Sequence, residues 1–203
     1  YVGDIGTNIS RQIDKNTAFA GILFERGLLK KSIKLISQSY ELAIQNDLIP
    51  KALVLNSLLE DIVVNSLPQS ERWDKINYFH NNEVRLMETV IVHSKLFFEE
   101  RKAVYLTSLP HPPAVPRKLK LIDLSVLQDP AHLKTQLGKL VRLTTLHMYY
   151  DLIGDSKNHF KISKENLLFQ RAIYNRSKSG VRVVNLAIAI MNHSSACVDA
   201  GYL

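Results

Sequence analysis

The segment from Ala20 to Ala43, AGILFERGLLKKSIKLISQSYELA, constrains the fold of this chain more than any other stretch. Apolar residues recur at helical spacing on both sides of Gly27, and glycine readily adopts the backbone conformation that ends a helix in a tight turn. The segment therefore predicts two antiparallel helices joined at Gly27. A hairpin of this kind cannot bury its apolar face alone, so it packs on neighbouring hairpins and leaves an extended surface for a partner.

Helical spacing of apolar residues continues through most of the chain, and no window alternates as a strand does. Residues 70–106 contain neither Gly nor Pro, which allows one very long helix or two helices joined near Asn81 and Asn82, and we favour two. We also expect a helix that starts at Pro50 and ends before Pro68, one over residues 130–153 with Asp129 as its N-cap, one over residues 163–172, and a last one capped by Ser179.

A proline-rich stretch divides the chain. Residues 109–120, LPHPPAVPRKLK, contain four of the seven prolines and predict an extended linker of polyproline type. We therefore expect N-terminal helical hairpins over residues 1–107, a linker over 108–120 and C-terminal hairpins over 121–203. Because no polar capping unit is visible after the last helix, we expect these hairpins to continue beyond the end of this sequence.

The residues around Gly27 follow a regular pattern of size. Large residues lie four positions before the glycine (Leu23) and nine positions after it (Ile36). Small residues lie five and twelve positions after it (Ser32 and Ser39), and Ala20 is the small residue of the first helix. This pattern resembles a tetratricopeptide repeat, in which small residues let two helices approach closely. Weaker matches surround Gly154 and Gly201.

The order of features also resembles a class of uncharacterised bacterial helical-repeat proteins. In these proteins a hairpin like LFERGLLKKSIKLI is followed by longer helices and then by a unit like YYDLIGD, which here covers residues 149–155. The two resemblances imply an all-α fold of antiparallel hairpins stacked as a tetratricopeptide-like α-solenoid, without a sheet. The alternative is an irregular helical bundle that contains one such hairpin.

Residues with catalytic chemistry form no recognisable motif. The eight glycines are scattered and make no phosphate-binding loop, and the seven histidines show no metal-ligand spacing with cysteine or acidic residues. The single cysteine, Cys197, lies in an apolar segment and is expected to pack rather than react. We therefore expect no enzyme activity, no catalytic residue, no metal ligand and no cofactor.

The cysteine count, the lengths of the apolar runs and the distribution of charge bear on where the protein is located and what it binds. One cysteine excludes an internal disulfide framework, so a reducing, cytoplasmic location is expected, and no apolar run is long enough to span a membrane. The net charge of +7 is uneven: residues 1–107 hold 13 basic and 13 acidic side chains, whereas residues 108–203 hold 13 and 6. An electrostatic partner is therefore expected to bind the second half.

One face of the helix expected over residues 130–153 carries basic and small residues between two apolar arcs. This strip consists of Lys134, Gly138, Arg142, Thr145 and Tyr149. It predicts a binding surface for a protein or peptide, in particular an acidic one, and a scaffold or regulatory role for the chain. Two alternatives stay open: a plain solvent-exposed ridge, and nucleic-acid binding by the basic half. The basic half lacks exposed aromatic residues between its charges, which favours a protein partner.

Overall fold

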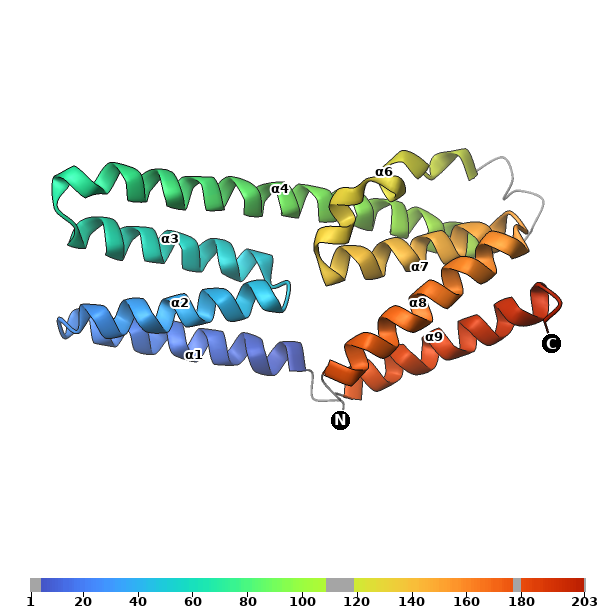
Figure 1. The fold of residues 1–203 in the computed structure, drawn as a ribbon, viewed down its shortest axis with the longest axis horizontal. Coiled ribbons are helices and arrows are strands. Elements are labelled where there is room, and N and C mark those ends of the chain that lie inside the picture. Colours follow the sequence, from blue (N-terminus) through green and yellow to red (C-terminus); the bar gives the residue numbers. More distant parts are fainter. Residues whose placement is uncertain (1–4, 109–118, 177–179, 203) are drawn as a thin grey trace. The chain divides into compact units, whose positions relative to one another are not determined.

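A computed structural model describes residues 5–108, 119–176 and 180–202 (Figure 1). Throughout these residues the structure is helical and contains no strand, so the expected all-α class is confirmed. None of the helices described is long and apolar enough to cross a membrane. The helices are α1 (Ile5–Glu25), α2 (Leu29–Gln45), α3 (Ile49–Ser66), α4 (Gln69–Thr107), α6 (Leu124–Gln128), α7 (Gln136–Leu152), α8 (Ser156–Arg176) and α9 (Gly180–Asp199), with 3-10 helices η2 (Leu119–Leu121) and η3 (Pro130–Lys134).

Contacts divide the chain into two compact units, Gly3–Ile91 and the part from Val92 onward. The division falls inside α4. The sequence instead suggested a boundary at the proline-rich segment of residues 108–120, most of which lies outside the described residues. The polyproline conformation expected over residues 109–118 thus lies outside the described residues, whereas Leu119 and Lys120 belong to the 3-10 helix η2 and are not extended. Each unit is considered separately below.

The first unit begins with the hairpin that the sequence predicted. Gly27 has a positive φ of 74°, and the backbone N–H of Leu28 donates to the carbonyl of Leu23 at 2.9 Å, which closes the end of α1. Ser32 is fully buried, and its hydroxyl donates to the carbonyl of Ala20 at 2.8 Å. Two small residues of the pattern, Ala20 and Ser32, are thus buried where α1 and α2 touch.

Consecutive helices of this unit pack side by side, α1 on α2 and α2 on α3. The turn from α2 to α3 resembles the turn at Gly27, except that Asp47, with a φ of 55°, takes the place of glycine. Asn56 on α3 is buried and donates to the carbonyl of Phe79 on α4 at 3.0 Å. The buried apolar residues of the unit are Ile13, Ala20, Ile36, Ala43, Ile49, Ala52, Leu55, Leu59, Ile62, Phe79 and Leu86.

The expected break at Asn81 and Asn82 is wrong, because α4 is one uninterrupted helix. Asn82 is buried, and its carbonyl oxygen accepts a hydrogen bond at 2.6 Å from Arg85, one turn further along. An asparagine side chain often competes with the helix for backbone hydrogen bonds. Here it bonds to a side chain on the same helix instead, so the helix continues.

The second unit contains the C-terminal half of α4 and the helices after it. The segment before α7 is fixed to α4 by Glu99, whose buried carboxylate accepts from the backbone N–H of Asp123 at 2.8 Å and from Lys102 at 2.7 Å. After it, α7 packs on α8 and α8 on α9 (Figure 1). The buried apolar residues at its centre are Leu96, Ala103, Leu106, Ile122, Leu127, Val141, Leu143, Leu146 and Ile162.

The turn between α7 and α8 sets the position of the residues considered next. Gly154 has a φ of 67°, and the backbone N–H of Asp155 donates to the carbonyl of Tyr150 at 3.0 Å. The Asp155 carboxylate then accepts from the backbone and the side chain of Asn158, at 3.0 and 2.7 Å, and caps the next helix. Helix α8 therefore starts at Ser156, earlier than the expected Ser163, while the expected cap Ser179 lies outside the described residues.

Candidate functional site

The strip expected to bind a partner does not lie on one helix. Asp129 caps a helix as expected, with its carboxylate accepting from the N–H of Ala131 at 2.8 Å, but this helix is the short η3. Thr135 is extended, with φ −122° and ψ 154°, and its hydroxyl accepts from the N–H of Gly138 at 2.9 Å to cap α7. The single helix expected over residues 130–153 is therefore wrong over its first six residues, 130–135, which form η3 and the extended Thr135.

The five residues of the strip lie in different environments. Lys134 is exposed on η3, whereas the other four are on α7, where Gly138 is buried and Thr145 is 0% exposed. Arg142 donates through Nε to the carbonyl of Leu127 at 2.7 Å, and Tyr149 is half-buried against the apolar core. The five residues therefore form no continuous exposed surface, and a binding role for them stays a prediction.

Gly138 lies against backbone. A Cβ atom added to it would be 2.6 Å from the carbonyl oxygen of His132 and 2.9 Å from the hydroxyl of Thr135. A glycine inside a helix lets either a ligand or another segment of the chain approach the backbone closely. The structure shows the close approach, in which η3 turns back over the first turn of α7.

Ionisable side chains from three helices meet near the C-terminal end of α7. His147 and Asp151 are one turn apart on α7, His159 follows on α8, and Asp199 is the last residue of α9. The Nε2 atoms of His147 and His159 are 2.8 Å apart, and Nδ1 of His159 is 3.8 Å from Oδ2 of Asp199. One ligand atom each from Asp151, His159 and Asp199 lie within 4.8 Å of one another. We call these four residues the His–Asp cluster.

Burial differs across the His–Asp cluster. His159 is only 3% exposed, while the Asp199 side chain is 47% exposed and Asp151 is also on the surface. Burial lowers the pKa of His147, as does the neighbouring His159, while Asp151 and a hydrogen bond to the backbone of Asn192 act in the opposite direction. His159 is thus on the buried side of the cluster, and the two carboxylates are on the side that solvent can reach.

His193 on α9 contacts two other side chains. The Nδ1 atom of His193 is 2.9 Å from the hydroxyl of Ser163, and its Nε2 atom is 3.8 Å from the sulfur of Cys197. Because the Ser163 hydroxyl donates to the carbonyl of Phe160, His193 donates to Ser163 and its Nε2 is left to accept from the thiol. Cys197 is thus a packed, weakly bonded thiol in this arrangement.

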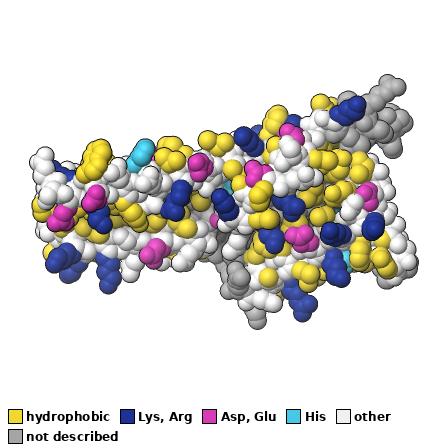
Figure 2. Space-filling view, turned by 45° about the horizontal axis from the view of Figure 1, so that its top comes forward, with side chains coloured by type: hydrophobic (Ala, Val, Ile, Leu, Met, Phe, Trp, Pro, Cys, Tyr) yellow, Lys and Arg dark blue, Asp and Glu magenta, His cyan; other side chains and the backbone are white. Residues whose placement is uncertain are grey.

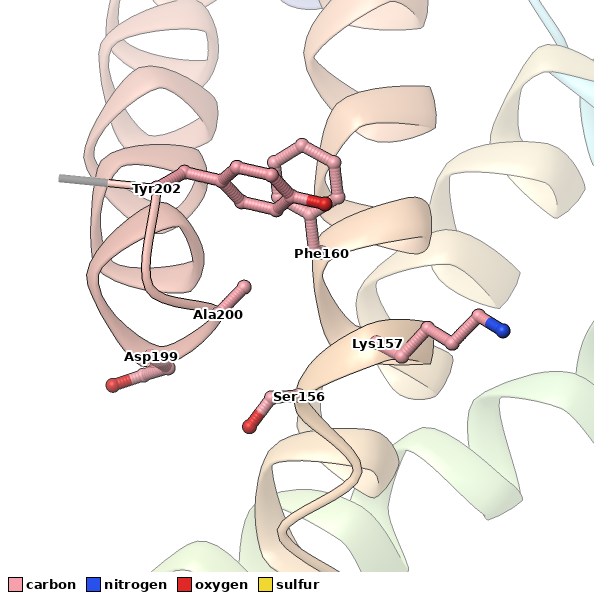
Figure 3. A pocket seen from close by; sticks show the side chains of 6 residues that line it. All are labelled: Ser156, Lys157, Phe160, Asp199, Ala200 and Tyr202. Atoms are coloured by element: carbon pink, nitrogen blue, oxygen red, sulfur yellow. The ribbon is translucent and has the colours of Figure 1, made fainter.

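A pocket of about 290 Å³ adjoins the His–Asp cluster (Figure 3). The rings of Phe160 and Tyr202 lie against each other with centroids 4.7 Å apart, and the Lys157 side chain points away from them. Asp199 belongs to both the pocket and the cluster. The lining residues are Ser156, Lys157, Phe160, Asp199, Ala200 and Tyr202.

The outer faces of α8 and α9 carry two rows of exposed side chains with the same spacing of four, three and seven residues. The row on α8 is basic: Lys157, Lys161, Lys164 and Arg171. The row on α9 is apolar: Val184, Ile188, Met191 and Val198. Elsewhere too, hydrophobic side chains come to the surface between basic and acidic ones (Figure 2).

Linear spacing does not reveal the His–Asp cluster, because its members come from three helices. The one readable signal is the spacing of four between His147 and Asp151, which places both on one helix face. His159 and Asp199 join them only through the turn at Gly154 and the packing of α9 on α8. In comparisons of sequence and fold, no protein-family model, curated protein or solved structure matches this chain.

Proposed function

We propose that this chain is a non-catalytic helical scaffold that binds an acidic, amphipathic segment of a protein partner through the outer faces of α8 and α9. Stacking of hairpins in the manner of a tetratricopeptide-like solenoid is part of the proposal. It is supported by the packing of consecutive helices, α1 on α2, α2 on α3, α7 on α8 and α8 on α9. Such stacks present long helix faces to a ligand.

The apolar row on α9 carries the proposal. Its four side chains project from one helix face at intervals of about one and two turns, and Met191 is 69% exposed. On the opposite face Ala189 and Ala196 are buried against the body of the unit. Large apolar side chains aligned on an exposed helix face are typical of an interaction surface, and covering the exposed part of each contributes about 1 kcal/mol.

The basic row on α8 supports an acidic partner. Lysine and arginine on one face attract a segment with carboxylates, and α8 packs directly on α9. A nucleic-acid ligand is less well supported, because the side chain within the row is Leu168 and not an aromatic residue on which a base could stack. The partner that would contact both rows is thus a segment that carries apolar and acidic side chains.

A comparison of three proteins tests the proposal: wild type, the double variant Ile188→Glu/Met191→Glu, and the control Val54→Glu. Val54 is exposed to a similar degree but lies on α3, in the other unit. Each protein, checked for helicity by circular dichroism, is used to capture proteins from nuclease-treated native lysate for mass spectrometry. We expect a protein that wild type and control retain and the double variant loses.

The captured protein is then bound to the purified chain by calorimetry at increasing salt. If apolar contacts hold the partner, its affinity should change only modestly as the salt concentration rises. If contacts to phosphate groups hold it, its affinity should fall steeply. Identical capture by all three proteins, or steeply salt-dependent capture of nucleic acid alone, contradicts the proposal. Self-association of wild type that the double variant loses would instead assign the apolar row to a second copy of the chain.

A further inference from the structure

The His–Asp cluster has the composition of a metal site. It combines a buried imidazole with two accessible carboxylates, and no lysine or arginine forms an ion pair with either Asp151 or Asp199 in the described residues. Nitrogen and oxygen ligands together suit divalent transition-metal ions such as Zn²⁺, while Mg²⁺ and Ca²⁺ prefer oxygen alone. Asp199 is also at the edge of the pocket, so the cluster is reachable from solvent.

Hydrogen bonding fixes which nitrogen of His159 faces the carboxylates. The Nε2 atom of His159 is 2.8 Å from Nε2 of His147, so this nitrogen is occupied by the contact between the two rings. The other ring nitrogen, Nδ1, is the one that faces Asp199. Because His159 is only 3% exposed, the contact with His147 holds a buried ring in this orientation.

This nitrogen faces the two carboxylates. Nδ1 of His159 is 3.8 Å from Oδ2 of Asp199, too far for a direct hydrogen bond, and the Asp151 carboxylate joins the same group. Gaps of this size between an imidazole nitrogen and carboxylate oxygens leave room for a cation that all three side chains ligate.

We propose that Asp151, His159 and Asp199 bind a divalent transition-metal ion of the zinc class, with His147 as the residue that orients the His159 ring. Tetrahedral zinc holds its ligand atoms about 3.3 Å apart. The three ligand atoms here are within 4.8 Å of one another, and the two carboxylates are at the surface, where a small rotation brings them closer. The second nitrogen of a ligating imidazole usually bonds to a group that fixes the orientation of the ring, and His147 takes that place here.

A metal at this position would join the ends of three helices. Because the ligands come from α7, α8 and α9, binding stabilises the packed form of the unit over the unfolded chain. This inference is independent of the proposed scaffold function, since the ligands are not members of the rows on α8 and α9. Loss of metal binding and loss of partner binding are therefore separate results.

Titration of the tag-free chain with ZnCl₂ by calorimetry, and with CoCl₂ by visible absorption, tests the proposal. We expect one saturable ion per chain, a Co²⁺ d–d absorption spectrum and a rise in melting temperature with Zn²⁺. Asp151→Asn and Asp199→Asn should each weaken binding by about tenfold or more. Asp129→Asn, an exposed carboxylate of the same unit whose replacement also caps a helix, is the matched control and should bind as wild type does.

The affinity and the Co²⁺ spectrum of a His147 variant together test whether His147 orients His159 or binds the metal itself. His147→Leu should weaken binding by about 10- to 100-fold while the shape of the Co²⁺ spectrum stays the same, because the ligand set is unchanged. A changed spectrum would make His147 a ligand and overturn its positioning role. Absence of saturable binding to wild type, or equal affinity for wild type, Asp151→Asn and Asp199→Asn, overturns the metal site.

Discussion

Replacing Gly138 by alanine tests the close approach of η3 to α7. The added Cβ would be 2.6 Å from the carbonyl oxygen of His132, whereas carbon and oxygen atoms normally approach to about 3.3 Å. The backbone of η3 must therefore move by about 0.7 Å, and overpacking of this kind destabilises a fold by about 1–3 kcal/mol. The same Cβ also crowds the hydroxyl of Thr135, the N-cap of α7, and a lost cap adds about 1 kcal/mol.

Alanine also has the higher helix propensity, which offsets up to about 1 kcal/mol of this loss. We therefore expect Gly138→Ala to lower the free energy of unfolding by about 1–3 kcal/mol. Gly21→Ala is the matched control, because Gly21 is on α1 and a Cβ there has no neighbouring atom within 4 Å. That control should be neutral or up to about 1 kcal/mol more stable.

Urea denaturation followed by far-ultraviolet circular dichroism measures both variants. The transition midpoint should fall for Gly138→Ala and stay or rise for Gly21→Ala, with similar slopes against denaturant. A Gly138→Ala protein as stable as wild type would refute the close approach. It would also return Gly138 to the other explanation, space kept open for a ligand.

Two further predictions concern helix ends. Gly27→Ala should lower the free energy of unfolding by about 1–2 kcal/mol in the same assay, because a φ of 74° is unfavourable for alanine even though a Cβ atom has space there. Gly27→Asn should lower the free energy of unfolding by less, because asparagine tolerates a positive φ better. Equal losses for the two variants would contradict the role of the positive φ. Hydrogen bonds from the backbone and side chain of Asn158 lower the pKa of Asp155 below 3.8. The carboxylate therefore stabilises the fold above that value and stops doing so as pH falls through its folded-state pKa. Asp155→Ala should be less stable than wild type near neutral pH, with a gap that closes in acid; a gap independent of pH would contradict the cap.

Turns between helices are the part of the fold most readily predicted from the sequence. Gly27, Gly154 and Gly201 all end helices with a positive φ, as the patterns around them suggested. Glycine marks such positions because it lacks the Cβ that makes this conformation unfavourable. A helix start at Pro50 was expected, but the positive φ of Asp47 before it was not, since aspartate adopts this conformation less often than glycine and is common elsewhere.

Helix boundaries that depend on one side-chain hydrogen bond were not predictable. Threonine occurs inside helices and at caps alike, so nothing local shows that Thr135 ends η3 and caps α7. The same ambiguity explains α4, where Asn82 looked like a break but accepts a hydrogen bond from Arg85. In both cases the outcome depends on which partner the side chain finds once the chain has folded.

The His–Asp cluster was unpredictable for a different reason. Its four residues span 147–199 of the sequence, and their approach depends on how α8 and α9 pack on α7. Each residue alone has an ordinary explanation as a surface acid or a packed histidine. Only the folded arrangement shows that His159 and the two carboxylates face one another.

The short connections between helices also bear on how fast the chain folds. Residues 26–28, 46–48 and 153–155 are all that separate α1 from α2, α2 from α3 and α7 from α8. The extensive helix pairings join sequence neighbours, so forming them closes only small loops. Proteins dominated by such local contacts fold in about microseconds to milliseconds. We therefore expect the pairing of neighbouring helices to be an early step of folding, with the turn residue already favouring the native geometry.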